Sequence, residues 1–445
     1  MKITKIHLKN WHQFQDLELD FTYPKGHKKE GQPLKKVCFI GPNGVGKTKL
    51  LNLIANFGKK DSEYVNNIKC DEIIISYVLG ESETDFLKNY LPLTVNEVFD
   101  IWIASNENLG KANTGKKYNE TNDPAKIFNS GEILTNATYD YKILNLDLVN
   151  KKIDLTNLKS KIIFVDQLAD FKGEVKSLGT SVNVDIPQYV IQTSKLKIDS
   201  RVGELGYGMI VDRKIANIAT SENGKIVEML EKNPDKTRDE IFSQFGDFKR
   251  IKEIFGEVTD NLITLDRYDS DTTDLVFKTK NGEEVNRFDL SSGVEQIFYR
   301  LLFVASFNLK ESIILVDEPE ISLFPDKQKK IVGWYTDYCD LGNSNQFFFA
   351  THSPLVMTQF EPEEIFVLNF GENGKVFVDK PNLGTLGYSS DEALGYWFGV
   401  DSRSDIYYKK LGRFDTLRDR QNLTEDEETE LKEIQDWIEK NKINI

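Results

Sequence analysis

The sequence has few cysteines and few histidines, and neither kind is clustered. The three cysteines, Cys38, Cys70 and Cys339, form no C-x-x-C pair, which argues against a disulfide framework and favours a reducing cytosol. None of the four histidines lies at metal-ligand spacing from cysteines or carboxylates. We therefore expect a cytoplasmic protein without a structural zinc site.

Long apolar runs and a net positive charge are also missing. The longest apolar run, residues 301–307, is far shorter than the roughly 18 residues of a membrane span, and the N-terminus has no apolar signal core, so we expect no membrane partner. The 57 lysines and arginines face 71 aspartates and glutamates, and the net charge of −14 gives no general support to nucleic-acid binding. The 445 residues, 39% of them apolar, suffice for two or three soluble domains.

The sequence does contain a complete phosphate-binding loop. Residues 41–48, GPNGVGKT, fit G-x-x-x-x-G-K-[ST] between a predicted strand at 37–40 and a predicted helix at 50–55. In such a loop the glycines let backbone N–H groups converge on an anion, the lysine reaches the β- and γ-phosphates, and the hydroxyl is offered to Mg²⁺. The alternative, a glycine-rich turn that binds nothing, is disfavoured by the complete motif. The predicted ATP-binding residues are Gly41, Pro42, Asn43, Gly44, Val45, Gly46, Lys47 and Thr48.

A second apolar strand ends in paired carboxylates. Residues 313–316 predict a buried strand, and Asp317 and Glu318 follow it directly. Because α/β proteins bind ligands at the carboxyl ends of their strands, Asp317 is predicted to hold Mg²⁺ and Glu318 to activate the attacking water. Carboxylates in this position are also common helix N-caps, but the phosphate loop in the same chain favours the catalytic interpretation.

Two more stretches fit the same kind of site. His352 follows a predicted strand at 347–350, where an imidazole can orient the water or contact the γ-phosphate; a surface histidine at a strand end is the alternative. Ser291, Ser292 and Gly293 open an amphipathic helix, where they form either an N-cap or an anion site from free N–H groups. Since the chain has its own phosphate loop, a second anion site suggests that ATP held by a partner subunit docks there.

The remaining pattern predicts an α/β chain with insertions. Alternating residues over 3–8 and 14–21 predict a hairpin, and Asn281-Gly282 predicts a hairpin turn. A capping box from Thr424 to Glu427 opens a helix to Lys440. Other predicted elements are strands at 71–79, 98–104, 137–148, 161–166, 261–266, 274–279 and 365–368, an exposed loop at 105–129, and helices over 204–256. The predicted domains are an N-terminal ATPase lobe at 1–167, a mainly helical insertion at 168–284, a C-terminal ATPase lobe at 285–380 and a helical extension at 381–445.

The order GPNGVGKT, LSSGVEQ, LVDEPE and THSP resembles that of the ABC-type ATPase heads of the SMC, RecF and OLD group, and the opening KITKIHLKNWHQFQDLELDF is similar to their first hairpin. The resemblance covers residues 1–57 and 285–370. It implies a P-loop ATPase head with a mixed sheet core and an antiparallel β layer, in which two heads enclose two ATP molecules. It also implies that Ser291 and Gly293 act on the partner's nucleotide and that Gln167 is the metal-binding glutamine. The chain departs from the family at Ser292 and at Phe324, where relatives often have histidine.

The resemblance extends to function. The insertion is too short for SMC coiled coils, and the tail after 368 is too short for the nuclease domain of OLD enzymes. Short heads of this kind resemble the ATPase components of Septu and retron-linked anti-phage systems, which implies a homodimer or higher oligomer that hydrolyses ATP and regulates a separate effector such as an HNH nuclease. The acidic helix at 425–439 is a candidate docking surface or a solvated helix.

Two alternatives stay open. A RecF-like protein would bind DNA, or RNA, in an ATP-dependent way during repair, and the basic residues near the phosphate loop permit this. A plain P-loop kinase would need an acceptor site and leaves LSSGVEQ unexplained. The basic residues in question are Lys35, Lys36, Lys47, Lys49, Lys59 and Lys60.

Overall fold

The fold was examined in a computed structural model. It describes residues 2–57, 70–78, 80–81, 98–103, 162–165, 190–192, 198–200, 203–205, 207–233, 247–269, 274–285, 289–307, 309–340, 342–380, 392, 395 and 403–440. The chain divides into two units, Met1–Gly387 and Tyr388–Ile445, which are treated separately.

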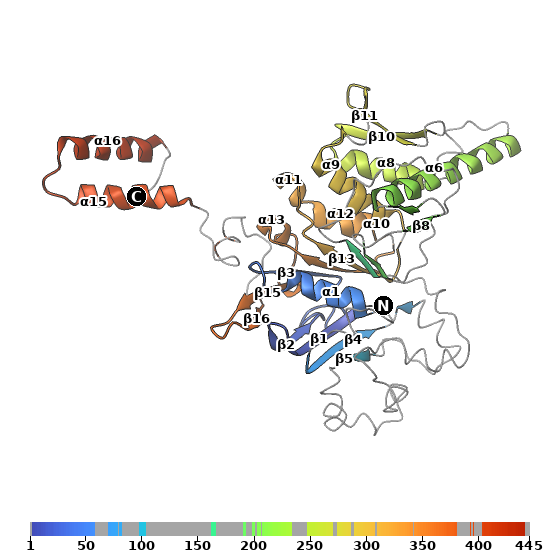
Figure 1. The fold of residues 1–445 in the computed structure, drawn as a ribbon, viewed down its shortest axis with the longest axis horizontal. Coiled ribbons are helices and arrows are strands. Elements are labelled where there is room, and N and C mark those ends of the chain that lie inside the picture. Colours follow the sequence, from blue (N-terminus) through green and yellow to red (C-terminus); the bar gives the residue numbers. More distant parts are fainter. Residues whose placement is uncertain are drawn as a thin grey trace, which may run out of the picture. The chain divides into compact units, whose positions relative to one another are not determined.

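The centre of the first unit is a mixed sheet, to which eleven strands of the described residues belong (Figure 1). At one side the strands are antiparallel, and at the other side β15, β3, β14, β13, β6 and β7 run parallel. The order across the sheet is β5 (Val98–Ile103), β4 (Glu72–Val78), β1 (Lys2–Trp11), β2 (Phe14–Asp20), β16 (Val376–Asp379), β15 (Ile365–Phe370), β3 (Lys36–Ile40), β14 (Gln346–Ala350), β13 (Ile313–Asp317), β6 (Ile162–Val165) and β7 (Val190–Gln192).

The two kinds of strand differ in burial as their sequences predict. In β1 and β2 the apolar residues alternate, so that Ile6, Leu8, Leu17 and Leu19 are buried while their neighbours meet solvent. In β13 and β14 every residue is buried, which is why the sequences of these strands are almost entirely apolar. The predicted α/β class with an antiparallel β part is confirmed. The antiparallel strands continue the same sheet instead of forming a second one.

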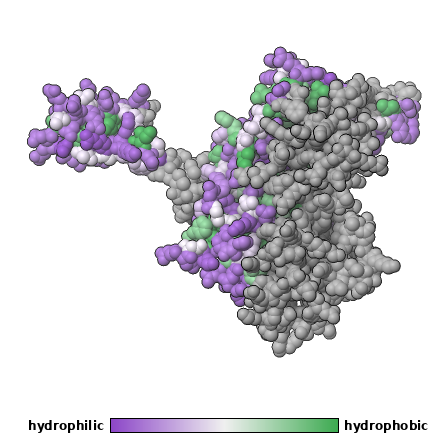
Figure 2. All heavy atoms as spheres, in the orientation of Figure 1, coloured by the Kyte–Doolittle hydropathy of each residue, from purple (hydrophilic) through white to green (hydrophobic). Residues whose placement is uncertain are grey.

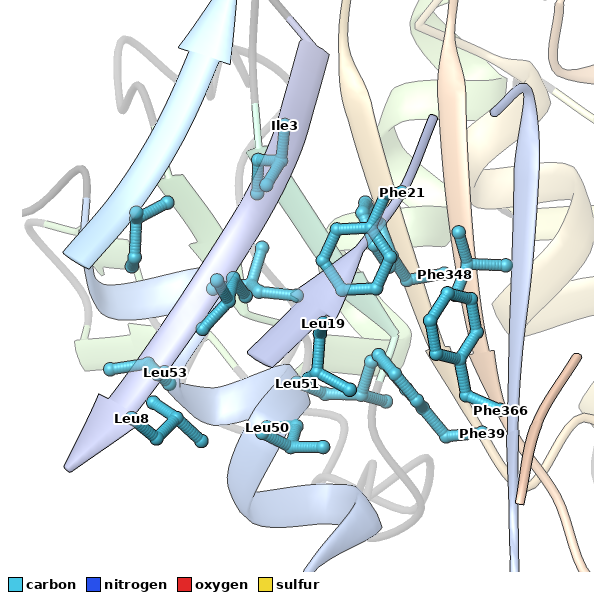
Figure 3. Close-up of a cluster of buried hydrophobic side chains, with 14 of the residues drawn as sticks. Ile3, Leu8, Leu19, Phe21, Phe39, Leu50, Leu51, Leu53, Phe348 and Phe366 are labelled. Carbon is cyan, nitrogen blue, oxygen red and sulfur yellow. The ribbon is translucent and has the colours of Figure 1, made fainter. Parts of the chain in front are cut away.

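Helix α1 (Lys47–Phe57) packs between the antiparallel and parallel strands of this sheet (Figure 1). Its Leu50, Leu51 and Leu53 are fully buried among side chains from both parts of the sheet, as Figure 3 shows. Each such leucine contributes roughly 1.5–3 kcal/mol through burial. The helix that begins at the phosphate loop is therefore anchored along its whole apolar face. Its labelled neighbours in Figure 3 are Ile3, Leu8, Leu19, Phe21, Phe39, Phe348 and Phe366.

A helical region follows in the sequence. It contains α6 (Tyr207–Lys232) and α8 (Asp247–Val258), and the side chain of Glu222 on α6 accepts hydrogen bonds from the first N–H groups of α8. The small sheets are β8 (Ile198–Ser200) with β9 (Gly203–Leu205), and β10 (Ile263–Asp269) with β11 (Asp274–Thr279) and β12 (Glu284–Val285). The predicted turn is confirmed, because Gly282 has a φ of 86° in the connection between β11 and β12.

Several helices precede and follow β13 and β14 in the sequence. One continuous helix is formed by α9 (Ser292–Gln296), the π-helical η6 (Ile297–Leu302) and α10 (Phe303–Ala305), and its apolar face is buried. We call it the signature helix. The shorter helices are α11 (Pro325–Gln328), α12 (Ile331–Tyr338), α13 (Pro354–Met357) and the 3₁₀ turn η7 (Pro362–Glu364).

The second unit is a helical hairpin of α15 (Asp405–Arg418) and α16 (Glu425–Lys440). The predicted capping box is confirmed: Thr424 N–H donates to Glu427 Oε2 at 3.1 Å, and Glu427 N–H donates to Thr424 Oγ1 at 3.3 Å. The visible surface of the hairpin is mainly hydrophilic (Figure 2). Arg413 of α15 forms an ion pair with Glu430 of α16 at 2.7 Å, so part of the acidic charge is balanced within the unit. The buried centre consists of Phe414, Leu417, Ile434 and Ile438.

Several predictions are not tested by this description. The loop at 105–129, the strand at 137–148 and Gln167 lie outside the described residues. The division into four predicted domains also stays a prediction. The helices that the structure describes include none with the length and apolar character to cross a membrane.

Candidate nucleotide-binding site

The loop between β3 and α1 has the backbone that its glycines permit. Gly41, Gly44 and Gly46 have φ angles of 143°, 81° and 105°, which are strained for any residue with a Cβ atom. A Cβ atom on Gly41 would also overlap the carbonyl oxygen of Leu368, and one on Gly46 would lie 2.6 Å from Cζ of Phe14. The loop is therefore held closely between β15 and the β1–β2 hairpin.

The turn of that hairpin contacts the loop directly. Gln13 Nε2 donates to the carbonyl oxygen of Gly44 at 3.2 Å, and Gln13 Oε1 accepts from Lys49 Nζ at 3.2 Å. A glutamine side chain thus ties the N-terminal hairpin to the middle of the loop and to the start of α1.

Lys47 lies buried at the start of α1. Its Nζ donates to the carbonyl oxygens of Gly41 at 2.7 Å and Pro42 at 3.3 Å, and lies 3.4 Å from Nδ1 of His352. Burial lowers the pKa of the Lys47 ammonium to about 8, against the opposing effect of the Asp317 carboxylate. The cation is thus held inside the loop, close to the imidazole.

Thr48 joins the loop to the end of β13. Its Oγ1 donates to Oδ2 of Asp317 at 2.9 Å, and the carboxylate is almost fully buried. Burial raises the pKa of Asp317 to about 6, while the hydrogen bond from Thr48 acts in the opposite direction. A hydroxyl and a carboxylate on the phosphate side of a nucleotide loop are the oxygen ligands that Mg²⁺ accepts, so the residues present fit this metal.

Glu318 stands where β13 ends and the chain turns. Its N–H donates to the carbonyl oxygen of Ala350 at 2.7 Å, and its Oε1 lies 3.8 Å from Nε2 of His352. The next helix begins only at Pro325, with Phe324 as its N-cap. The alternative interpretation of these carboxylates as a helix N-cap is therefore wrong.

The loop that carries His352 is fixed by a buried carboxylate. Glu320 Oε1 accepts from Thr351 Oγ1 and from the N–H of His352, both at 2.8 Å. Burial, together with the nearby Lys47 ammonium, lowers the pKa of His352, so its imidazole is neutral at pH 7. His352 is therefore no isolated surface histidine, because it lies between the lysine of the loop and Glu318.

Ser291, Ser292 and Gly293 form the exposed start of the signature helix. Ser291 occupies the N-cap position, but its side chain makes no capping hydrogen bond. A Cβ atom on Gly293 would lie 2.8 Å from the carbonyl oxygen of Ser322, so this glycine allows close packing against the turn after β13. Within the described residues, no hydrogen bond connects these three residues to the phosphate loop of the same chain.

The sheet order brings the other predicted residues together. The phosphate loop, His352 and Asp317-Glu318 follow β3, β14 and β13, which are adjacent parallel strands. Sequence reasoning missed three residues that support this group, namely Gln13, Arg300 and Glu320. The only available signal was for Arg300, a charged residue within an otherwise apolar helix stripe. The predicted glutamine at 167 lies outside the described part of the chain.

Comparison with known proteins gives one family match and several distant structural likenesses. The model of a family described as "AAA ATPase domain" matches residues 1–357. No protein with a curated description matches the chain. Solved structures with similar folds include an Smc head bound to the C-winged helix domain of ScpA (13% identity, TM-score 0.43, 86% of this chain and 98% of the other) and the SMC head domain from Thermotoga maritima (12%, 0.39, 86% and 100%). Another is the Smc head domain of Pyrococcus furiosus with an extended coiled coil bound to the C-terminal domain of ScpA (12%, 0.42, 85% and 96%).

Proposed function

The chain belongs to the AAA ATPase domain family, and on that premise we propose that it hydrolyses Mg²⁺-bound ATP between two copies of itself. The observation that carries the proposal is the meeting of the phosphate loop, Asp317, Glu318 and His352 at the ends of three adjacent strands. Lys47 binds the β- and γ-phosphates. Thr48 and Asp317 hold Mg²⁺, with Gln167 as the further ligand that the sequence predicts. When bound, Mg²⁺ neutralises charge on the phosphate oxygens.

Glu318 is the group that accepts the proton of the attacking water. Its carboxylate extends beyond the end of β13 beside the phosphate loop, with His352 Nε2 at 3.8 Å. A neutral imidazole donates a hydrogen bond from one ring nitrogen and accepts one at the other. With Lys47 donating to Nδ1, His352 keeps its Nε2 proton toward Glu318 and so orients the carboxylate for the water.

The second copy completes the site. Ser291, Ser292 and Gly293 present the free N–H groups of a helix start that makes no hydrogen bond to its own phosphate loop. Free N–H groups at a helix start bind anions. The anion expected at this surface is the γ-phosphate of the ATP that the partner holds. Closure then follows nucleotide binding and opening follows hydrolysis. Phe324, whose side chain is 75% exposed beside this surface, lies where a partner would cover it.

Mixing two inactive variants tests the shared site. Lys47→Ala removes the loop's cation and Ser291→Arg blocks the helix start, so each alone should lose nearly all ATPase activity. In a mixture, each mixed dimer contains one site with neither change. Activity should therefore return to about a quarter of the wild-type level. Full activity of Ser291→Arg alone, or no recovery at any ratio, would contradict the shared site; Lys47→Ala mixed with Lys47→Ala,Ser291→Arg is the matched control without an intact site.

The affinity for ATP should depend on pH through Lys47. In the nucleotide-free protein its pKa is about 8, and bound phosphates raise that pKa because they stabilise the ammonium. Above pH 8, binding must therefore take up a proton, and the affinity should fall by up to about tenfold per pH unit. Below pH 8 Lys47 is already protonated, so its contribution to the ATP affinity no longer changes with pH. Calorimetric titration from pH 7 to 9.5 measures it, and Lys47→Arg, which stays charged, should show no such slope.

For the biological role we favour regulation of a separate effector in anti-phage defence. The support is the resemblance of a short ATPase head of this kind to the ATPase components of Septu and retron-linked systems, with an HNH nuclease as the expected kind of partner. In this arrangement the head acts as a switch, and any nuclease activity resides in the partner. Strong Mg²⁺-dependent DNA cleavage by the purified protein alone would contradict that division.

The RecF-like alternative receives less support from the basic residues near the loop. Lys36 forms an ion pair with Glu364 at 3.4 Å, and Lys35 forms one with Asp340 at 3.5 Å. Lys49 donates to Gln13. These three cations contact groups of the same chain, whereas Lys59 and Lys60 lie outside the described residues. ATP-dependent, salt-sensitive binding to duplex DNA would restore this alternative.

A further inference from the structure

We infer that Arg300 is a positioning residue that fixes Glu318 to the signature helix, so that docking of the partner's nucleotide on that helix sets the catalytic carboxylate in place. The inference rests on the proposed function, because it concerns the same ATP site. It adds to that proposal a connection between the surface that meets the partner and the group that activates water. Three features of the described residues carry it.

The first feature is the backbone of Glu318. Its φ of 45° lies in the left-handed region, which is strained for a residue other than glycine. Strained backbone persists where neighbouring groups hold it, and it is concentrated at functional sites. This backbone conformation turns the chain sharply after Asp317. We infer that this turn, and not the strand itself, gives the Glu318 side chain its direction toward His352.

The second feature is the pair of groups that hold this turn. On one side the N–H of Glu318 donates to the carbonyl oxygen of Ala350 in β14. On the other side Arg300 Nη1 donates to the carbonyl oxygen of Glu318 at 3.0 Å, and Arg300 Nη2 donates to that of Asp317. The guanidinium therefore binds the two consecutive carbonyls that bracket the bend.

The third feature is the environment of Arg300. The residue is only 2% exposed, and its Nε is buried with no hydrogen-bond partner among the described residues. Burying a guanidinium is unfavourable before its hydrogen bonds are counted, and an apolar residue would suit the stripe formed by its neighbours Ile297 and Leu301. Stability alone is a poor reason for an arginine at this position. Its contacts with the bend after β13 supply a better one.

The signature helix contacts the turn after β13 at two places. Arg300 lies in the π-helical segment Ile297–Leu302, a kind of helix widening that often occurs at functional sites. At the start of the same helix, Gly293 packs against the carbonyl oxygen of Ser322. Glu318 and Ser322, which has a φ of 59°, are therefore both in contact with one rigid helix. A shift of the helix start is transmitted to Glu318 through these contacts.

The test is a double-mutant cycle in the full-length chain. Arg300→Met removes the guanidinium at similar volume. It should lower kcat at least about tenfold and change the dissociation constant for ATP by less than about twofold, because Arg300 contacts only the backbone carbonyl of Asp317 and neither its carboxylate nor the phosphate loop. In the Glu318→Gln background the same substitution should have no further effect on kcat, since Arg300 acts through Glu318. Arg300→Lys, whose single donor nitrogen cannot reach both carbonyls in the fork geometry of a guanidinium, should fall between Met and wild type. Leu302→Met on the same helix is the matched control and should keep normal kcat.

The outcomes separate this inference from the proposed function. If Glu318→Gln is slow while Arg300→Met or Arg300→Lys turns over normally, the positioning role is wrong and the ATP site stands. If Glu318→Gln itself turns over normally, the proposed role of Glu318 fails first. Equal loss of ATP affinity and kcat, or an additive loss in the double variant, would make Arg300 merely structural and overturn the inference. If Arg300→Met does not fold, Arg300→Lys alone decides between these results.

Discussion

Glu318→Gln is expected to bind ATP as well as the wild type and to hydrolyse it about 10²–10⁴ times more slowly. Glutamine keeps the size and shape of the side chain but cannot accept the proton of the attacking water. The residues proposed to hold nucleotide are Lys47, Thr48 and Asp317, and their hydrogen bonds to Gly41 and to each other do not involve the Glu318 carboxylate. Loss of the base should therefore appear in kcat and not in the dissociation constant.

Single-turnover hydrolysis, with the protein in excess over ATP and above the dissociation constant, measures this effect without product release. The matched control is Asp326→Asn, which removes an exposed carboxylate from the first turn of α11 and should leave the rate unchanged. Trapped ATP should also stabilise closed dimers of Glu318→Gln, visible as an ATP-dependent increase in mass by light scattering. A turnover number near that of the wild type would remove Glu318 from the role of base.

The parts of this site that lie in consecutive residues were predictable from the sequence. The eight residues 41–48 specify their own loop, because three glycines permit positive φ angles and the next residues begin a helix. The pair Asp317-Glu318 was found in the same way, as charges at the end of a wholly apolar strand. The sequence could also place His352, because adjacent parallel strands end at one edge of a sheet.

The supporting residues could not be predicted, because their partners are distant in the chain. Gln13 contacts Gly44 because the β1–β2 hairpin lies against the phosphate loop. No local sequence pattern distinguishes Gln13 from other polar turn residues. The spacing of the apolar residues predicted the signature helix. The spacing in a π-helix differs too little from that in an α-helix for the sequence to reveal the π-helical segment. Arg300, which donates to the carbonyl oxygen of Glu318, lies within that π-helical segment. The antiparallel strands were predicted, but not their continuity with the parallel sheet, which depends on the single pair of Val376 with Phe14.

Lys47→Ala is expected to abolish ATP binding in the concentration range in which the wild type is saturated. A hydrogen bond that involves a charged group contributes roughly 1.5–3 kcal/mol, and this lysine is proposed to serve two phosphates, so the affinity should fall by about 10²-fold or more. The loop itself should also loosen, because Lys47 Nζ holds the carbonyl oxygens of Gly41 and Pro42. Equilibrium binding of a fluorescent ATP analogue measures the loss.

Lys49→Ala is the matched control for that loss. It removes the same charge two residues away, but Lys49 is exposed and its described hydrogen bond goes to Gln13 and not into the loop. If general electrostatic attraction held the nucleotide, both variants would weaken binding similarly, and 0.5 M salt would weaken it further. If the loop geometry holds it, only Lys47→Ala should lose binding. Its thermal unfolding without nucleotide should stay close to that of the wild type, because removal of a buried cation offsets the lost hydrogen bonds to Gly41 and Pro42. Unchanged ATP affinity in Lys47→Ala would mean that the nucleotide binds elsewhere, and the composite site with Ser291 and Gly293 would lose its basis.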